Sequence, residues 1–556
     1  MTRIRNNVRK TKKNDADILA WLMSGLFGVL SALFLCFGYQ LEEYERIDFS
    51  DRNMLTALLM IFIVITIDTR HVWKNYDGAR EGKKLFGLIQ LPGAETVQKG
   101  DKKSFLTTWA VLVALNLPVL LAEFPGFFTY DAQEELNEVL TRTFSTHYPL
   151  LHVLLLGGTI ALVHKVTGSW NAGIFLYIFI QMLVITAIFA YIIEYMKSRG
   201  IGNKRRILWT LYYGLFPTIV MFTLCSTKDG LFSALLLLLT AFLIQLVREP
   251  EQFLGNRKKL VAFMMTAVLM PCFRHNGFYA YLVFVPFALW FFRKQLKKTL
   301  VMILVAPVII YLIISSALST AFSSEITHHQ EMLTVPIMQL TRVYTYDRDD
   351  LGRDEVEVLT SYIDADKLAL YTPRLSDMVK VGFNNELYEQ DSASFWNLWK
   401  KNLIRHPITY LNAWFMTSYG YWYPAAKINV YKGITVYTFT YDKSSYFGYE
   451  VELPGERISL IPAIDRLYRY LSIGSFFEDM PVLGLFMAPG LMIIMFLFVL
   501  LYRVSKKDFA GIIPFLPVFL TWCTVLLGPT YLPRYVLYLW LCFPLLFIGR
   551  KTANQA

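Results

Sequence analysis

Long apolar stretches separated by short polar segments dominate this sequence. A helix needs about 20 apolar residues to cross the hydrocarbon core of a bilayer, and about twelve stretches approach that length. Six of them occupy residues 18–38, 54–67, 105–122, 172–195, 207–224 and 231–247. Six more occupy residues 260–272, 278–292, 300–321, 482–502, 511–527 and 535–548. The pattern predicts an all-α polytopic membrane protein with about twelve transmembrane helices.

One further apolar stretch, residues 150–166, is predicted not to cross the membrane. Basic residues gather in cytoplasmic loops, and residues 1–13 contain six Lys and Arg and no acidic residue. The later basic clusters fall on the same side as this tail only if residues 150–166 do not cross. The sequence Gly168-Ser-Trp-Asn-Ala-Gly173 that follows is a break typical of a re-entrant or surface-lying helix. We therefore expect both termini in the cytoplasm.

This topology divides the chain into four parts. Residues 1–104 hold the tail and two additional spans, and residues 105–321 hold a membrane core whose extracytoplasmic loop is 123–171. Residues 322–481 form an aromatic-rich extracytoplasmic region, and residues 482–556 supply three spans and a cytoplasmic tail. The dense aromatic residues of the third part indicate either a surface that rests on the membrane or stacks on sugars, or ordinary packing in a small cap.

Composition agrees with the membrane class. Hydrophobic residues make up 55% of the 556 residues and charged residues only 17%, which excludes an ordinary soluble globule. Residues 320–480 carry a net charge of −6 and the rest of the chain +17, so the overall +11 follows from topology and gives no reason to expect nucleic acid. The five cysteines lie in or beside apolar stretches without Cys-x-x-Cys spacing, which argues against a disulfide or zinc framework.

Candidate chemistry is concentrated where predicted spans end at the outer boundary. Ionisable residues are costly to hold near a bilayer and are functional candidates for that reason. A carboxylate there can accept a proton or hold a divalent cation, and cations can neutralise a phosphate. Four groups have this character: Asp131 with Glu134, Glu135, His147 and His152; Ser226-Thr-Lys228-Asp229-Gly; Arg274-His275-Asn276; and Pro529-Thr-Tyr-Leu-Pro-Arg534-Tyr535.

Each of these groups also has a structural interpretation. Asp229 could serve only to pair with Lys228, and Arg534 could extend to the interface without any other role. His147 precedes Tyr-Pro, and a turn residue is the favoured interpretation there.

Other familiar motifs are weak or missing. His328 and His329 with Glu331 resemble a metal site, but adjacent histidines point apart on a helix or strand, which favours a solvated loop. The sequence contains no Walker A loop, HExxH, GxSxG or Rossmann fingerprint. Neither an ATPase nor a soluble nucleotide-sugar domain is therefore expected.

The pattern of a span, then Pro125-Gly-Phe-Phe-Thr-Tyr-Asp131, then His147-Tyr-Pro-Leu-Leu and a non-crossing helix resembles the GT-C superfamily of integral-membrane glycosyltransferases. The likeness is greatest to bacterial members related to lipid A aminoarabinose transferases and protein mannosyltransferases. It implies a GT-C-like fold with juxtamembrane helices in loop 123–171. It also implies transfer of a sugar from a polyprenyl-phosphate-linked donor to a cell-envelope glycan, lipid or polymer, at the outer face of the bacterial plasma membrane.

The resemblance also implies roles for individual residues. Asp131 would be catalytic, activating the acceptor hydroxyl directly or through Mg or Mn, and Asp229 would assist it. The donor phosphate would be bound by Lys228, Arg274, Arg534 and Tyr535, and Glu134, His147, His152 and His275 would serve the acceptor or the loop.

The sequence departs from the superfamily pattern in two places. The usual His-Pro-Pro or Lys-Pro-Pro is His147-Tyr-Pro149 here, and two spans precede the core. The identity of the acceptor therefore stays open. Two alternatives also remain: a polymerase or ligase of cell-surface polysaccharide, and a transporter of lipid-linked oligosaccharide, although a transporter favours an internal repeat that the sequence lacks.

Overall fold

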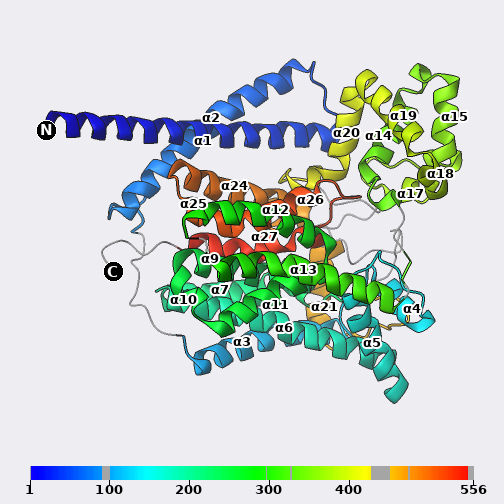
Figure 1. Ribbon diagram of the computed structural model, residues 1–556, viewed down its shortest axis with the longest axis horizontal. Helices are drawn as coiled ribbons and strands as arrows, with labels where there is room; N and C mark the ends of the chain where they lie inside the picture. The colour runs from blue at the N-terminus through cyan, green and yellow to red at the C-terminus, as the bar shows by residue number, and fades with distance from the viewer. Residues whose placement is uncertain are drawn as a thin grey trace.

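The computed structural model describes residues 2–90, 100–295, 297–322, 324–325, 329–426, 451–473 and 476–548. Most of these residues are helical, and the extended segments among them form only isolated bridges (Figure 1). Seven helices in the described part of the chain are long and apolar enough to cross a membrane, which identifies a helical membrane protein. They are α1 (Thr2–Tyr44), α2 (Arg52–Arg80), α3 (Lys102–Ala122), α5 (Leu150–Thr167), α6 (Trp170–Ser198), α9 (Asp229–Arg248) and α13 (Lys298–Ala321). The total of about twelve spans stays a prediction.

The remaining predicted spans are shorter helices, several of them interrupted. Residues 207–224 form two helices because Pro217 has no N–H and disfavours helical geometry at Phe216, whose ψ is 119°. Prolines also begin or interrupt the helices near the C-terminus. The bounds are α7 (Asn203–Leu215), α8 (Pro217–Thr223), α11 (Arg257–Phe273), α12 (His275–Phe291), α23 (Pro481–Leu485), α24 (Pro489–Ser505), α25 (Phe509–Ile512), α26 (Leu516–Val525), η6 (Pro533–Val536), α27 (Leu537–Cys542) and η7 (Phe543–Phe547).

Helix α9 lies at the centre of the membrane core. In its most apolar 18-residue stretch, 83% of the residues are buried, as expected for a helix that is hydrophobic on all sides. Helix α27 packs against it through Phe232 and Tyr538, and Tyr213 of α7 donates a hydrogen bond to the carbonyl of Leu541. The C-terminal segment therefore completes the core that begins at α3.

Helices α1 and α2 lie at the periphery. They pack on each other and on α24, where Trp73 contacts Phe498 and Tyr502. In the most apolar 18-residue stretch of α2, only 6% of the residues are buried, so most of this helix faces outward with apolar side chains. Such a surface is suited to lipid.

The region 322–481 contains two structural units. Helices α14–α20, which we call the cap, enclose a small apolar core of their own around Ile337 and Phe395. Trp396 and Trp399 pack against this core, which is the ordinary cap packing considered from the sequence; residues 437–449 lie outside the described residues. The cap helices are α14 (Thr334–Tyr346), α15 (Arg353–Tyr362), α16 (Ala365–Leu368), α17 (Asp377–Lys380), α18 (Asn385–Gln390), α19 (Ser392–Arg405) and α20 (Pro407–Ser418).

The second unit of this region returns to the membrane core. The backbone N–H groups of Ile458 and Leu460 donate to the carbonyls of Phe124 and Leu121, and α21 (Pro462–Ile473) packs on α3. Figure 1 shows α21 among the membrane helices and the cap at the far end of the molecule.

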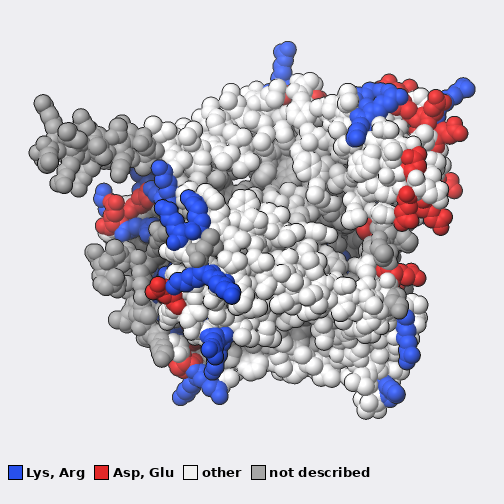
Figure 2. All heavy atoms as spheres, in the orientation of Figure 1, with Lys and Arg blue, Asp and Glu red and all other residues white. Residues whose placement is uncertain are grey.

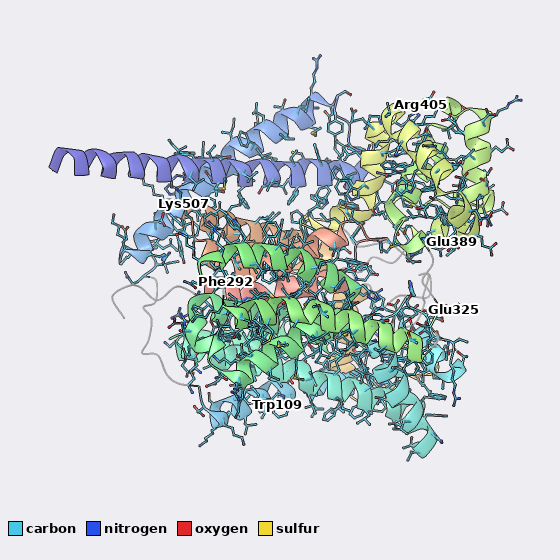
Figure 3. All side chains as sticks on the ribbon, viewed as in Figure 1. Trp109, Phe292, Glu325, Glu389, Arg405 and Lys507 are labelled. Atoms are coloured by element: carbon cyan, nitrogen blue, oxygen red, sulfur yellow. The ribbon has the colours of Figure 1, made fainter. Side chains whose placement is uncertain are left out.

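Charge is distributed unequally along the molecule. Figure 2 shows a broad uncharged band between one end rich in Lys and Arg and another end, over the cap, rich in Asp and Glu. Figure 3 places Glu325 at the cap end with Glu389 and Arg405, and Lys507 at the opposite end. An uncharged band between two charged ends is the arrangement a bilayer requires. Which end faces the cytoplasm stays a prediction.

Candidate active site

The loop after α3 carries Asp131, and its course is fixed by the loop between α8 and α9. The N–H of Phe127 donates to the carbonyl of Leu224 over 3.1 Å, and the N–H of Ser226 donates to the carbonyl of Phe127 over 2.9 Å. Gly126 permits the turn because its φ is +113°, in the left-handed region that favours glycine. This pairing brings Asp131 close to the residues that follow Ser226.

Five charged side chains from the four predicted groups meet here. Lys228 Nζ lies 2.5 Å from Asp131 Oδ2, and Arg534 Nη1 lies 3.4 Å from the same oxygen. Arg534 Nη1 also lies 3.5 Å from Asp229 Oδ2, and Arg274 donates to Asp229 Oδ1. With Tyr535, we call these residues the charged cluster. The sequence groups thus converge, and Asp229 pairs with two arginines rather than with Lys228.

Tyrosine rings hold the two guanidinium groups in place. The guanidinium carbon of Arg274 lies 4.3 Å from the centroid of the Tyr535 ring, and that of Arg534 lies 4.7 Å from it. Arg534 also lies 4.1 Å from the Tyr130 ring, and its Nη2 donates to the Tyr535 hydroxyl over 3.0 Å. Such cation–π contacts offset part of the cost of burying arginine. Arg534 Nε is buried and has no hydrogen-bond partner among the described residues, so a donor remains available.

Neighbouring charges shift the pKa values of Asp131 and Lys228 in the cluster. Burial raises the pKa of Asp131, but the charges of Lys228 and Arg534 outweigh burial and hold this pKa well below its usual range. Burial lowers the pKa of Lys228, yet Asp131 and Glu135 raise it by more. Both side chains are therefore charged near neutral pH. An aspartate with such a low pKa is a weak base.

Glu135 and His152 form a supporting layer behind the cluster. The Glu135 carboxylate lies 3.4 Å from Lys228 Nζ and pairs with His152 Nδ1, while the Tyr177 hydroxyl lies 2.8 Å from His152 Nε2. The side chains of Glu135 and His152 are 1% and 0% exposed. His152 therefore positions Glu135 rather than facing an open site.

The other predicted residues lie at the edge of the cluster. Glu134 and His147 are exposed and make no side-chain hydrogen bond to the charged cluster within the described residues. His275 Nδ1 lies 3.1 Å from the Tyr311 hydroxyl, both facing a small cavity of about 40 Å³ whose other walls are largely apolar. Tyr148 lines this cavity and its ring lies 4.9 Å from Lys228 Nζ. An apolar cavity therefore adjoins the charged cluster.

The cap contacts the loop that carries Arg534. The N–H of Ser376 donates to the carbonyl of Pro529 over 3.2 Å, and Thr530 Oγ1 donates to the carbonyl of Arg374 over 2.8 Å. On the other side of the site, Glu325 and the segment before His147 exchange backbone hydrogen bonds. The charged cluster thus lies at the cap end of the membrane helices.

The sequence did not single out Glu452, which lies beside this loop. Its N–H donates to the carbonyl of Phe128 over 2.7 Å, and its Oε2 accepts from the N–H of Gln133 at 3.3 Å. The residue is only 5% exposed. Burial, helped by the nearby charge of Asp131, raises the pKa of Glu452 to about 8. Its local sequence, Val-Glu-Leu-Pro, contains no signal of this placement.

Among the described residues, the partners of Asp131 are not those of a Mg or Mn site, and the predicted metal requirement stays a prediction. Divalent cations of this kind require several oxygen ligands, whereas Asp131 is paired with an ammonium and a guanidinium group. Within the residues that the structure describes, no three His, Cys, Asp or Glu side chains gather in a metal-binding group.

His329 and Glu331, which resemble a metal site in the sequence, contact other side chains of the cap. His329 Nε2 lies 3.1 Å from Glu389, and Glu331 lies 2.7 Å from Lys380 Nζ. His328 lies outside the described residues. The contacts of the two described residues are ion pairs of the cap.

A family model described as "Family of unknown function (DUF6020)" matches residues 138–555. The chain belongs to the DUF6020 family. No curated protein and no solved structure matches it. The part of the chain that DUF6020 covers includes Lys228, Asp229, Arg274, Glu452 and Arg534, whereas Asp131 precedes it.

Proposed function

We propose that the protein is a membrane glycosyltransferase of the outer face of the bacterial plasma membrane. It transfers a sugar from a polyprenyl-phosphate-linked donor to a hydroxyl group of a cell-envelope glycan, lipid or polymer. The observation that supports this proposal is the convergence of Lys228, Arg274 and Arg534 beside an apolar cavity. A lipid-linked sugar has an apolar chain and a phosphate anion. The cations are complementary to the phosphate, and the small cavity offers an apolar wall beside them for the first atoms of the chain.

The cations suit the departure of a phosphate. When the bond between the anomeric carbon and the phosphate oxygen breaks, its electron pair stays on the phosphate and negative charge grows there. Cations already fixed in position stabilise that charge without reorganising. Asp131 and Asp229 hold Lys228, Arg274 and Arg534 in place before the donor arrives.

The position of the cluster favours catalysis over transport. Asp229 is the first residue of α9, and Arg274 separates α11 from α12. Arg534 lies in η6, before α27. Secondary transporters place their substrate site near the bilayer midplane, whereas these charges occupy helix ends. The cap contacts the segment that precedes Arg534, and we assign acceptor binding to this side of the cluster.

The test uses purified protein in phospholipid nanodiscs, a panel of undecaprenyl phosphates carrying radiolabelled hexoses or pentoses, and a cell-envelope glycan extract as acceptor. We expect label to move from one donor into a glycosidic product. Arg274→Ala should reduce the rate about 10²–10³-fold, the usual effect of removing one preorganised charge partner. Arg257→Ala is the control because Arg257 is exposed at the opposite end of α11.

Other outcomes identify the alternatives. Movement of intact donor across a liposome bilayer without any glycosidic product would support a transporter. Joining of lipid-linked oligosaccharides into chains would support a polymerase or ligase. If Arg274→Ala transfers sugar at the wild-type rate, the proposed phosphate site is wrong.

A further inference from the structure

A sugar transfer requires a proton acceptor, and Asp131 is poorly suited to that task. The hydroxyl that attacks the sugar must lose its proton to a base whose pKa is near the working pH. Asp131 is paired with both Lys228 and Arg534, and these charges stabilise its ionised form. The same contacts that hold the cations therefore weaken Asp131 as a base.

Glu452 is attached to the Asp131 loop on both sides of Asp131. Its backbone N–H contacts the carbonyl of Phe128, three residues before Asp131, and its carboxylate contacts the N–H of Gln133, two residues after it. Glu452 makes no ion pair of 4 Å or less within the described residues, unlike the acidic residues of the charged cluster. Within the described residues, it is a buried carboxyl group beside the Asp131 loop without a cation in ion-pair contact.

We propose that Glu452 accepts the proton from the acceptor hydroxyl, while Asp131 positions Lys228 and Arg534 for the leaving phosphate. This assignment rests on the proposed glycosyl transfer. In the step, the hydroxyl O–H bond breaks and its proton goes to the Glu452 carboxylate. The oxygen forms a bond to the anomeric carbon, and the bond from that carbon to the phosphate oxygen breaks with its electrons on the phosphate.

The electrostatic surroundings of Glu452 support this assignment. Burial and the charge of Asp131 raise its pKa to about 8, while the Gln133 N–H and the charge of Arg534 act in the opposite direction. The Cys225 thiol also lies close enough to interact with it. A carboxyl group with this pKa exchanges its proton near neutral pH, as an efficient general base does.

A structural role is the alternative to be excluded. Glu452 accepts a hydrogen bond at the start of α4 (Ala132–Thr141), and capping of that helix could be its whole function. Glu452→Gln separates the two roles, because the amide oxygen can still accept from Gln133 N–H but the side chain no longer takes a proton. Glu456→Gln is the matched control, since Glu456 is exposed four residues further on.

The experiment measures kcat and KM for the donor as a function of pH in nanodiscs. Wild type should show activity that rises with pH around an apparent pKa of about 8. Glu452→Gln should lower kcat about 10²–10⁴-fold, leave KM for the donor nearly unchanged and remove this rise. Glu456→Gln should match wild type at every pH.

Three results would overturn the assignment. If Glu452→Gln keeps the wild-type kcat and the same increase of activity with pH, Glu452 only caps α4. If the increase of activity with pH disappears in Asp131→Asn but persists in Glu452→Gln, Asp131 is the base. If wild type forms no glycosidic product from any donor, the proposed function fails and the assignment fails with it; if wild type transfers sugar, only the role of Glu452 is in question.

Discussion

The substitution Asp229→Asn tests whether the charged cluster is a balanced set of ions. The Asp229 side chain is 0% exposed and contacts Arg274, Arg534 and the Thr227 hydroxyl. Asparagine has nearly the same shape and retains an oxygen for Thr227, so the change removes charge rather than volume. Arg274 and Arg534 are 14% and 6% exposed, so water cannot replace the lost carboxylate well. Removing one partner of a buried pair costs about 3–5 kcal/mol, and we expect a loss of that size.

The assay is thermal unfolding followed with a thiol-reactive dye. All five cysteines are free and four are buried, so dye labelling reports unfolding. The double variant Asp229→Asn with Arg274→Ala should lose less stability than the two single changes summed, because they share one interaction. Glu251→Gln is the control: its exposed pair with Lys297, 3.7 Å apart, should contribute about 0–1 kcal/mol. An unchanged melting temperature for Asp229→Asn, together with strict additivity, would refute the ion-pair account.

Three further predictions follow from the site. Gly126→Ala should destabilise the protein by about 1–3 kcal/mol and lower transfer, because φ is +113° and an added Cβ would lie 2.5 Å from Ile178; equal melting temperatures would contradict this. Burial raises the pKa of Glu452 in the folded protein to about 8, above the ordinary value of a glutamate carboxyl group. Its contribution to stability is therefore present below that ordinary value and is lost as pH rises through about 8. Glu452→Gln should therefore flatten the fall in melting temperature between those pH values, and an unaltered pH profile would show that Glu452 titrates normally. Because Asp131 is paired with Lys228 and Arg534, EDTA should leave the transfer rate unchanged; inhibition that Mg²⁺ reverses would show a metal requirement.

Local signals were sufficient to predict the long membrane helices. The apolar stretches at residues 105–122, 172–195, 231–247 and 300–321 became α3, α6, α9 and α13, because an uninterrupted apolar run of this length satisfies its backbone only as a helix in lipid. The division at Phe216–Pro217 is marked in the sequence by a proline, although the apolar stretch continues on both sides of it. The predicted non-crossing of residues 150–166 stays a prediction, since α5 is long and apolar enough to span.

The site was predictable in part for a different reason. Asp131, Lys228, Arg274 and Arg534 each follow or precede an apolar segment, so a consistent topology places them at one membrane boundary. Glu452 had no such signal, because it lies 319 residues after Gln133, which it contacts, and belongs to an irregular segment. Among the described residues, hydrogen bonds to Phe128 and Gln133 hold it there, and tertiary contacts of this kind leave no pattern in the local sequence.

The most direct test of the account is a product analysis of the transfer reaction. Wild-type protein in nanodiscs is incubated with a labelled polyprenyl-phosphate sugar and acceptor, and both products are quantified by mass spectrometry. The account predicts a new glycosidic product and free polyprenyl phosphate in equal amounts, with both strongly reduced in Arg274→Ala. Donor that stays intact across the whole panel, or that only changes leaflet, would contradict the central claim.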